Sequence, residues 1–233
     1  MKASNNHKAI IIYGPPGSGK GTQAELLANK LDFIHFDTGK YLRKLLHDPK
    51  LQKDKTIQSE RRLNDSGKLN TSSWVLKIVT QKTKEIDQFS KGVIFSGSPR
   101  SVFEAFGDKN QNGLMDILEK IYGKKNIYIF EIGISENETI KRNTHRLVCS
   151  ICRSPIMGQS SIINCKLNKC PFCGGKLKHR FDDKKEVILT RLKEYQERTK
   201  PIISKLKNKK YKVIFIDGKP MPFKIHEKII KHL

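Results

Sequence analysis

A glycine-rich segment, Gly14–Gln23, constrains the fold of this chain more than any other part of the sequence. It reads GPPGSGKGTQ and lies between an isoleucine-rich run, Ala9–Tyr13, and a segment of helical character, Thr22–Leu31. A strand, a glycine turn and a helix in this order present backbone N–H groups and a helix N-terminus to a phosphate. The segment therefore predicts a phosphate-binding loop, with Lys20 adding positive charge at the β- and γ-phosphates. The alternative is a glycine-rich turn that holds no ligand.

The hydroxyl residue of this loop departs from the general pattern, which places Ser or Thr directly after the Lys. Here Gly21 takes that place and the hydroxyl follows at Thr22. We expect six consecutive residues to contact the phosphates of the bound nucleotide: Gly17, Ser18, Gly19, Lys20, Gly21 and Thr22.

Five short apolar runs alternate with helical stretches, which predicts an α/β, three-layer P-loop fold with a five-stranded parallel sheet. The runs are Ala9–Tyr13, Phe33–Phe36, Val93–Ser96, Ile127–Ile132 and Val213–Ile216. Two segments interrupt the pattern: a charged, helical insert at 37–70 and a cysteine-containing segment at 145–183. The core is then expected to comprise residues 1–36, 71–144 and 184–233.

The charge balance of the chain is strongly basic, with 46 Lys and Arg residues against 23 Asp and Glu and a formal net charge of +23. This excess suits polyanionic partners such as nucleotides or nucleic acid. No basic stripe with interleaved aromatic residues is present, so we expect nucleotides as partners and no dedicated nucleic-acid role. No apolar run approaches the roughly 18 residues of a membrane span, and Met1–Lys8 is polar. We expect a monomer in the cytoplasm, without membrane association.

Four cysteines form two knuckles, Cys149-x-x-Cys152 and Cys170-x-x-Cys173. This spacing is typical of a zinc ribbon, in which four thiolates form a closed tetrahedral site for a structural Zn²⁺. The segment is too small to bury a core, so metal binding would supply much of its folding energy. Disulfides are the alternative, disfavoured in a reducing cytosol. The fifth cysteine, Cys165, would be a free thiol or a substitute ligand.

Seven short motifs in chain order, spread over nearly the whole chain, resemble the adenylate kinase family of nucleoside monophosphate kinases. They are Gly19-Lys20-Gly21-Thr22-Gln23, Thr38-Gly39-x-x-Leu42-Arg43, Gly67-Lys68-Leu69, Gly97-x-Pro99-Arg100, the pair Arg142 and Arg146, Arg180-x-Asp182-Asp183 with Arg191, and Asp217-Gly218-Lys219-Pro220. The resemblance implies direct phosphoryl transfer from ATP with Mg²⁺ to a nucleoside monophosphate, AMP above all. It makes the insert the monophosphate-binding region and the cysteine-containing segment a lid that keeps water out.

The resemblance also implies a role for each matched residue. The acceptor nucleotide would contact Thr38, Gly39, Arg43, Lys68, Leu69, Gly97, Arg100, Glu104, Arg180 and Arg191. The donor nucleotide would contact the phosphate loop together with Arg142, Arg146 and Lys219, and the catalytic residues would be Lys20, Arg100, Arg146, Arg180 and Arg191. These residue types suit the chemistry, because transfer between two nucleotides depends on positioning and charge neutralisation, and a guanidinium grips two phosphate oxygens at once. For each arginine alone, the alternative is a solvated surface cation.

Asp182 and Asp183 would pair with lid arginines or act as hinge residues, the alternative being charges at a helix N-terminus that face solvent.

Lys40 and Ser96 stand where the resembled family has aspartates that help to hold hydrated Mg²⁺, and Asp37 lies where it would compensate. Ser98 replaces the phenylalanine of the family's Gly-Phe-Pro-Arg motif.

Glu104 takes the place of a glutamine that contacts the acceptor adenine. A carboxylate only accepts hydrogen bonds, and guanine offers two donors to it, so one hypothesis is that GMP is accepted. The alternative is that Glu104 faces solvent or takes a proton.

Three functions are therefore compared: an active nucleoside monophosphate kinase, a nucleotide-binding module of the same fold with altered acceptor specificity or weak catalysis, and a zinc-ribbon protein whose basic surface binds nucleic acid. Lys20 and the arginines favour the enzyme over the module, and the order of the motifs favours both over the nucleic-acid binder.

Overall fold

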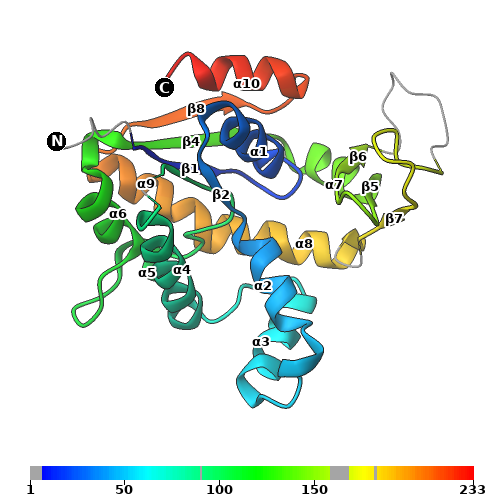
Figure 1. Ribbon diagram of the computed structural model, residues 1–233, viewed down its shortest axis with the longest axis horizontal. Coiled ribbons are helices and arrows are strands. Elements are labelled where there is room, and N and C mark those ends of the chain that lie inside the picture. Colours follow the sequence, from blue (N-terminus) through cyan, green and yellow to red (C-terminus); the bar gives the residue numbers. More distant parts are fainter. Residues whose placement is uncertain (1–6, 90, 158–167, 181–182) are drawn as a thin grey trace.

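The computed structural model describes residues 7–89, 91–157, 168–180 and 183–233 of the chain (Figure 1). The strands are β1 (Ala9–Tyr13), β2 (Ile34–Phe36), β3 (Val93–Phe95), β4 (Ile127–Gly133), β5 (Arg146–Cys149), β6 (Pro155–Met157), β7 (Leu177–His179) and β8 (Val213–Asp217). The α-helices are α1 (Lys20–Leu31), α2 (Thr38–Leu46), α3 (Lys55–Asp65), α4 (Ser72–Asp87), α5 (Val102–Phe106), α6 (Leu114–Tyr122), α7 (Glu136–Thr144), α8 (Lys185–Glu194), α9 (Lys200–Asn208) and α10 (Pro222–Ile230).

Five strands form the central sheet in the order β2-β3-β1-β4-β8, and every neighbouring pair is parallel. Parallel neighbours require a crossover, and the helices between these strands supply it. The five strands coincide with the five apolar runs in the sequence, which confirms the predicted α/β fold with a five-stranded parallel sheet.

Side-chain alternation along the strands divides the interior into two cores, one on each face of the sheet. On β1, Ile11 and Tyr13 pack with residues of α4, α6 and α9, whereas Ile10 and Ile12 pack with residues of α1 and α10. All five residues of β1 are buried, because helices cover both faces of this central strand. A strand that is apolar throughout is typical of a parallel sheet covered in this way.

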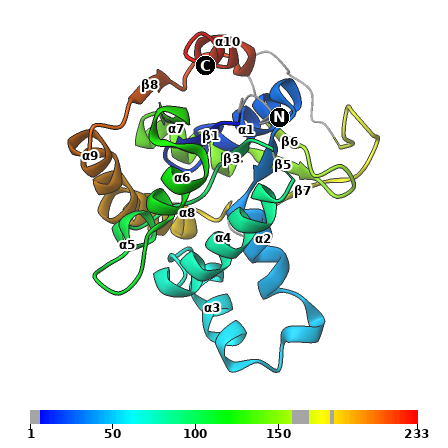
Figure 2. The same cartoon turned by 60° about the vertical axis from the view of Figure 1, so that its left-hand side comes forward.

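Two smaller regions project from the core in different directions (Figures 1 and 2). Helices α2 and α3 lie within the insert, and β5, β6 and β7 form an antiparallel sheet in the order β6-β5-β7 within the cysteine-containing segment. The bounds 37–70 and 145–183 for these two regions stay a prediction.

A long helical run follows the cysteine-containing segment and extends along the core. Helix α8 continues without a break through a π-helical turn, Tyr195–Thr199, into α9. Figure 1 shows this run extending from the side of β7 to the opposite end of the molecule. No helix among the described residues is both long and apolar enough to cross a membrane.

Candidate active site

The phosphate loop folds its lysine back over its own backbone. Lys20 is the first residue of α1, and its Nζ donates hydrogen bonds to the carbonyl oxygens of Gly14 at 2.7 Å and Pro15 at 2.8 Å. Gly17 and Gly19 have φ angles of 79° and 90°, in the region that favours glycine. The loop therefore joins strand β1 to helix α1, the order that the sequence predicted.

Helix α7 closes one side of the loop. A Cβ atom on Gly17 would lie 2.6 Å from Nδ2 of Asn143, so α7 packs directly against the loop backbone. Asn143 is fully buried, and its Nδ2 donates to the carbonyl oxygen of Thr139 at 2.7 Å. Sequence reasoning missed Asn143, because no local pattern signals that this asparagine meets a loop more than a hundred residues earlier.

Two predicted acceptor-site segments meet at Arg100. A Cβ on Gly39, in α2, would lie 3.2 Å from a terminal guanidinium nitrogen of Arg100 and 3.3 Å from one of Arg43. A Cβ on Gly97 would lie 3.0 Å from the same guanidinium of Arg100. The two glycines thus leave room for two guanidinium groups, and Thr38 Oγ1 lies buried nearby without a hydrogen-bond partner among the described residues.

Lys20 lies in a concentration of positive charge. Burial first, and then the charges of Arg100, Arg191 and Arg146, lower the pKa of Lys20 from its ordinary value of 10.5 to about 7, against an opposing effect of Asp37. Four of the five predicted catalytic residues therefore lie close enough to interact electrostatically. A site with this excess of cations is suited to a ligand that carries several negative charges.

A buried carboxylate joins two of these arginines. Asp183 has a side chain that is 2% exposed and accepts a hydrogen bond from Arg146 Nε at 2.9 Å. One of its oxygens also lies 3.8 Å from Arg191 of α8. Arg146 begins the lid strand β5, so this pairing ties the cysteine-containing region to the core and confirms the expected pairing for Asp183. Asp182 lies outside the described residues.

Arg142 lies against the loop that follows β8. Its guanidinium donates to the carbonyl oxygens of Gly218 at 3.0 Å and Lys219 at 3.3 Å, and its Nε donates to Glu138 at 2.6 Å. The structure thus brings together Arg142 and Lys219, which were both predicted to contact the donor nucleotide. The Lys219 side chain is exposed.

The remaining predicted contacts lie at the edges of the site. A Cβ on Gly67 would come within 2.9 Å of Val187, so the end of the insert packs against α8, while Lys68 is exposed and Leu69 is half-buried. Arg180 is half-buried beyond β7, and its carbonyl oxygen accepts from the Asp183 N–H.

Lys40 and Ser96, which stand where the family has aspartates, make hydrogen-bond contacts with neighbouring residues of this chain. Ser96 Oγ lies 2.7 Å from His35 Nε2 in the adjacent strand, and burial lowers the pKa of His35. Asp37 caps α2 by accepting from the Lys40 N–H at 2.9 Å. Its effect on the pKa of Lys20 places Asp37 near the phosphate loop. The His35–Ser96 contact had no signal in the sequence, because it joins residues 61 positions apart.

Glu104 is 3% exposed, so the alternative that it faces solvent is wrong. Its Oε2 accepts from the Arg100 N–H at 2.9 Å and its Oε1 from the Ser101 hydroxyl at 3.1 Å. Burial raises the pKa of this carboxyl group, whereas the contacts with Arg100 and Ser101 lower it. Because the side chain is buried and both oxygens are engaged with the Arg100–Ser101 segment, this geometry lends no support to guanine recognition.

The sulfur atoms of Cys149, Cys152, Cys170 and Cys173 lie within 4.8 Å of one another. The Cys149–Cys173 and Cys152–Cys170 sulfur separations are 3.4 and 3.6 Å. Two thiolates on a tetrahedral zinc ion lie about 3.8 Å apart, since each Zn–S bond is about 2.3 Å, whereas a disulfide bond is about 2.05 Å. The cluster therefore fits a metal ion better than disulfides. Cys165 lies outside the described residues.

Comparison with known proteins agrees with the geometry. A family model described as adenylate kinase matches residues 12–211. The chain belongs to the adenylate kinase family. Relatives named adenylate kinase include those of Petrotoga mobilis, 32% identical over 90% of this chain and 89% of its own length, and of Borreliella burgdorferi, 32% identical over 95% and 96%. The adenylate kinase of Chlamydia pneumoniae is 36% identical over 84% of this chain and 83% of its own length.

Adenylate kinases use ATP with Mg²⁺, and the site of this family member has groups that suit both. The phosphate loop supplies backbone N–H groups and the Thr22 hydroxyl, while Asp37 is a carboxylate near Lys20. The four cysteines are compatible with a structural zinc ion.

Proposed function

We propose that this chain is an adenylate kinase that transfers a phosphoryl group from ATP to AMP and releases two molecules of ADP. The observation that carries the proposal is the convergence of Lys20 with Arg100, Arg146 and Arg191 at one end of a parallel sheet. Phosphoryl transfer between nucleotides asks mainly for positioning and charge neutralisation, and this cluster supplies both.

The two nucleotides would occupy opposite sides of this cluster. Arg43 and Arg100, which lie against Gly39, would hold the acceptor phosphate, with Thr38, Gly97, Lys68 and Leu69 lining that side. The phosphate loop, with Ser18 and Gly21 among its N–H donors, would hold the donor phosphates. Arg142 and Lys219 would lie at the donor base.

Lys20 would exchange its contacts with the Gly14 and Pro15 carbonyls for phosphate oxygens, and Arg146, Arg180 and Arg191 would surround the transferring group. When bound with ATP, Mg²⁺ neutralises phosphate charge, and Thr22 and Asp37 would hold it or its waters. We further propose Zn²⁺ as the ion of the four-cysteine cluster, and residues 145–183 as a lid that closes over the nucleotides and excludes water.

A coupled assay that follows ADP formation from ATP with AMP, GMP, CMP or UMP tests the proposal. We expect AMP to be the best acceptor and Lys20→Ala to lower kcat by at least about a hundredfold, because a preorganised cation at the transferring group is lost. Lys30→Ala is the matched control, since Lys30 is an exposed lysine at the other end of the same helix, and it is expected to have wild-type kinetics.

Tight binding of a bisubstrate dinucleotide without turnover of any monophosphate would contradict the proposal and favour a binding module. The expected monomeric state is checked by light scattering with and without nucleotide, and the expected cytoplasmic location by fractionation of cells that produce the protein.

A further inference from the structure

The backbone of Arg100 is held from both sides by buried groups. On one side, Glu104 accepts from the Arg100 N–H at 2.9 Å. On the other side, Thr199 Oγ1 donates to the Arg100 carbonyl oxygen at 2.8 Å. Glu104 and Thr199 are 3% and 6% exposed, so neither contact competes freely with water. Both hydrogen-bonding groups of this residue's main chain are therefore fixed by side chains.

The hydrogen bond between Glu104 and the Arg100 N–H is a variant of the capping box found at helix N-termini. Ser101 is the N-cap of α5, and its Oγ accepts from the Glu104 N–H at 3.2 Å. In a capping box, the acidic side chain three residues later returns to the N–H of the cap residue itself. Here it reaches one residue further back, to Arg100, and so acts on the residue that carries the guanidinium.

A chain of polar contacts connects this carboxylate to a second element. The Ser101 hydroxyl donates to Glu104 Oε1 at 3.1 Å, and its oxygen lies 2.8 Å from that of Ser72 at the start of α4. Arg198, in the π-helical turn, donates to Ser72 Oγ at 3.0 Å. The chain therefore runs from a guanidinium to a carboxylate, and the charge of Arg198 opposes the rise in the pKa of Glu104 that burial causes.

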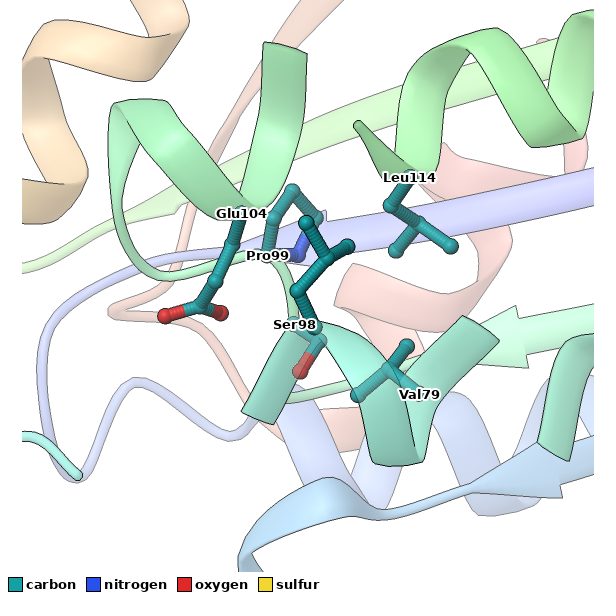
Figure 3. Close-up of a pocket in the computed structure, with 6 residues that line it drawn as sticks. Val79, Ser98, Pro99, Glu104 and Leu114 are labelled. Atoms are coloured by element: carbon teal, nitrogen blue, oxygen red, sulfur yellow. The ribbon is translucent and has the colours of Figure 1, made fainter. Parts of the chain in front are cut away.

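Apolar side chains also pack against the same turn. A small pocket beneath it is lined by Leu76, Val79, Ser98, Pro99, Glu104 and Leu114 (Figure 3). Ser98 is buried, and its hydroxyl has no hydrogen-bond partner within the described part of the chain. Glu104 and Thr199, and not Ser98, therefore supply the polar contacts that position this turn.

We propose that Glu104 is a positioning residue, whose carboxylate, together with Thr199, fixes the main chain of Arg100 so that its guanidinium stays beside Gly39 and Gly97. The role rests on the proposed function, in which Arg100 holds the acceptor phosphate. Glu104 then acts through Arg100 on the acceptor phosphate and does not contact the acceptor base.

A double-mutant cycle tests whether Glu104 acts through Arg100. Glu104→Ala is expected to lower kcat/KM for AMP by about tenfold to a hundredfold, since it removes a charged partner of a buried N–H, and to leave the KM for ATP unchanged. In an Arg100→Met background, the same substitution is expected to cost less than about threefold, because the two residues act as one unit. Independent losses that multiply in the double variant would overturn the proposal.

A base-preference measurement separates positioning from base contact. Glu104→Gln keeps one oxygen that can accept from the Arg100 N–H, so we expect it to recover most of the activity lost in Glu104→Ala. We also expect the ratio of kcat/KM for AMP to that for GMP to stay within about threefold in both variants. A shift of this ratio by tenfold or more would mean that Glu104 contacts the base, and would overturn the positioning role.

Thr199→Val is a second variant that tests the positioning of Arg100, and it serves if Glu104→Ala does not fold. It preserves side-chain shape and removes the hydroxyl that donates to the Arg100 carbonyl, so a roughly threefold to tenfold loss of kcat/KM for AMP is expected, again without effect in the Arg100→Met background. Glu85→Gln, at a half-buried carboxylate of α4 that pairs with Lys82, is the matched control and is expected to behave as wild type. Melting curves of all variants establish that they are folded.

The outcomes for the two proposals differ. A folded wild-type chain that turns over no monophosphate overturns the proposed function and the positioning role with it. An active wild type, with independent losses or a shifted base preference, overturns the positioning role alone.

Discussion

The parallel-sheet core buries apolar side chains on both faces of its sheet, whereas the described part of the lid gathers its buried residues around four cysteines. In the core, Phe95, Phe130 and most residues of β1 are completely inaccessible. In the lid, Ile151 and Phe172 lie within the two cysteine knuckles and are 68% and 75% exposed, while Cys149 and Cys170 are buried. The hydrophobic effect therefore stabilises the core, and metal coordination is the interaction that can stabilise the lid.

Loss of the lid metal is the largest expected effect and would test this difference directly. Cys152→Ser, or a strong chelator, removes a contribution on the order of 10 kcal/mol to the folding of the lid. We expect the metal content to fall and the lid to lose protection from hydrogen exchange, while the core retains its protection and melts within about 3 °C of the wild type. Unchanged metal content together with unchanged hydrogen-exchange protection of the lid would argue against a structural zinc ion.

Truncation of a core side chain should produce the opposite pattern. Phe130→Ala creates a cavity beside the sheet and is expected to cost about 3–5 kcal/mol of unfolding free energy. Denaturant unfolding measures this loss, and the metal content per folded molecule should not change. If this substitution released the metal as well, core and lid would form one cooperative unit.

Asp183 connects the two regions, and its removal should have an intermediate effect. Asp183→Asn weakens the buried contact with Arg146 and Arg191 and is expected to cost about 1–3 kcal/mol, measured by denaturant unfolding, together with a lower kcat. Glu197→Gln is the matched control, because Glu197 pairs with Lys193 on the surface, where such pairs contribute less than about 1 kcal/mol. Equal effects of the two variants would contradict a joining role for Asp183.

The smallest expected effect is a proton exchange at Lys20. Its pKa of about 7 in the folded protein lies below the ordinary value of 10.5, so phosphate binding, which favours the charged amine, should take up protons at about pH 8. Calorimetric titration of ATP in buffers of different ionisation enthalpy measures this uptake, and Lys20→Met should abolish it.

The same pKa difference affects stability. Between about pH 7 and pH 10 the unfolded chain binds more protons at Lys20 than the folded chain does, so the contribution of Lys20 to stability should become more favourable as the pH rises through this range. Lys20→Met should remove this dependence from the pH profile of the unfolding free energy. A profile identical to that of the wild type would contradict the lowered pKa.

The sequence predicted those parts of the molecule that depend on local pattern. The five strands follow from short apolar runs, the phosphate loop from its glycines and the cysteine cluster from two knuckles, because each depends on residues close in the chain. Contacts that join distant segments had no such signal. Thr199 meets the Arg100 carbonyl across 99 positions and Arg198 meets Ser72 across 126, and only the packing of α8 and α9 against the core brings them together. For the same reason, the proposed role of Glu104 in positioning Arg100 could not be predicted from its being a glutamate.

The contacts of Lys20 with Gly14 and Pro15 have a consequence for nucleotide binding. The side-chain nitrogen of Lys20 already donates to two carbonyl oxygens, so an arriving phosphate does not fill a vacant position but displaces two resident acceptors. Hydrogen bonds are exchanged one for one, and the net gain comes from replacing neutral oxygens with charged ones. The two carbonyl oxygens thus take the place of phosphate oxygens while no nucleotide is bound, and their contacts with Lys20 keep the loop in its conformation between turnovers.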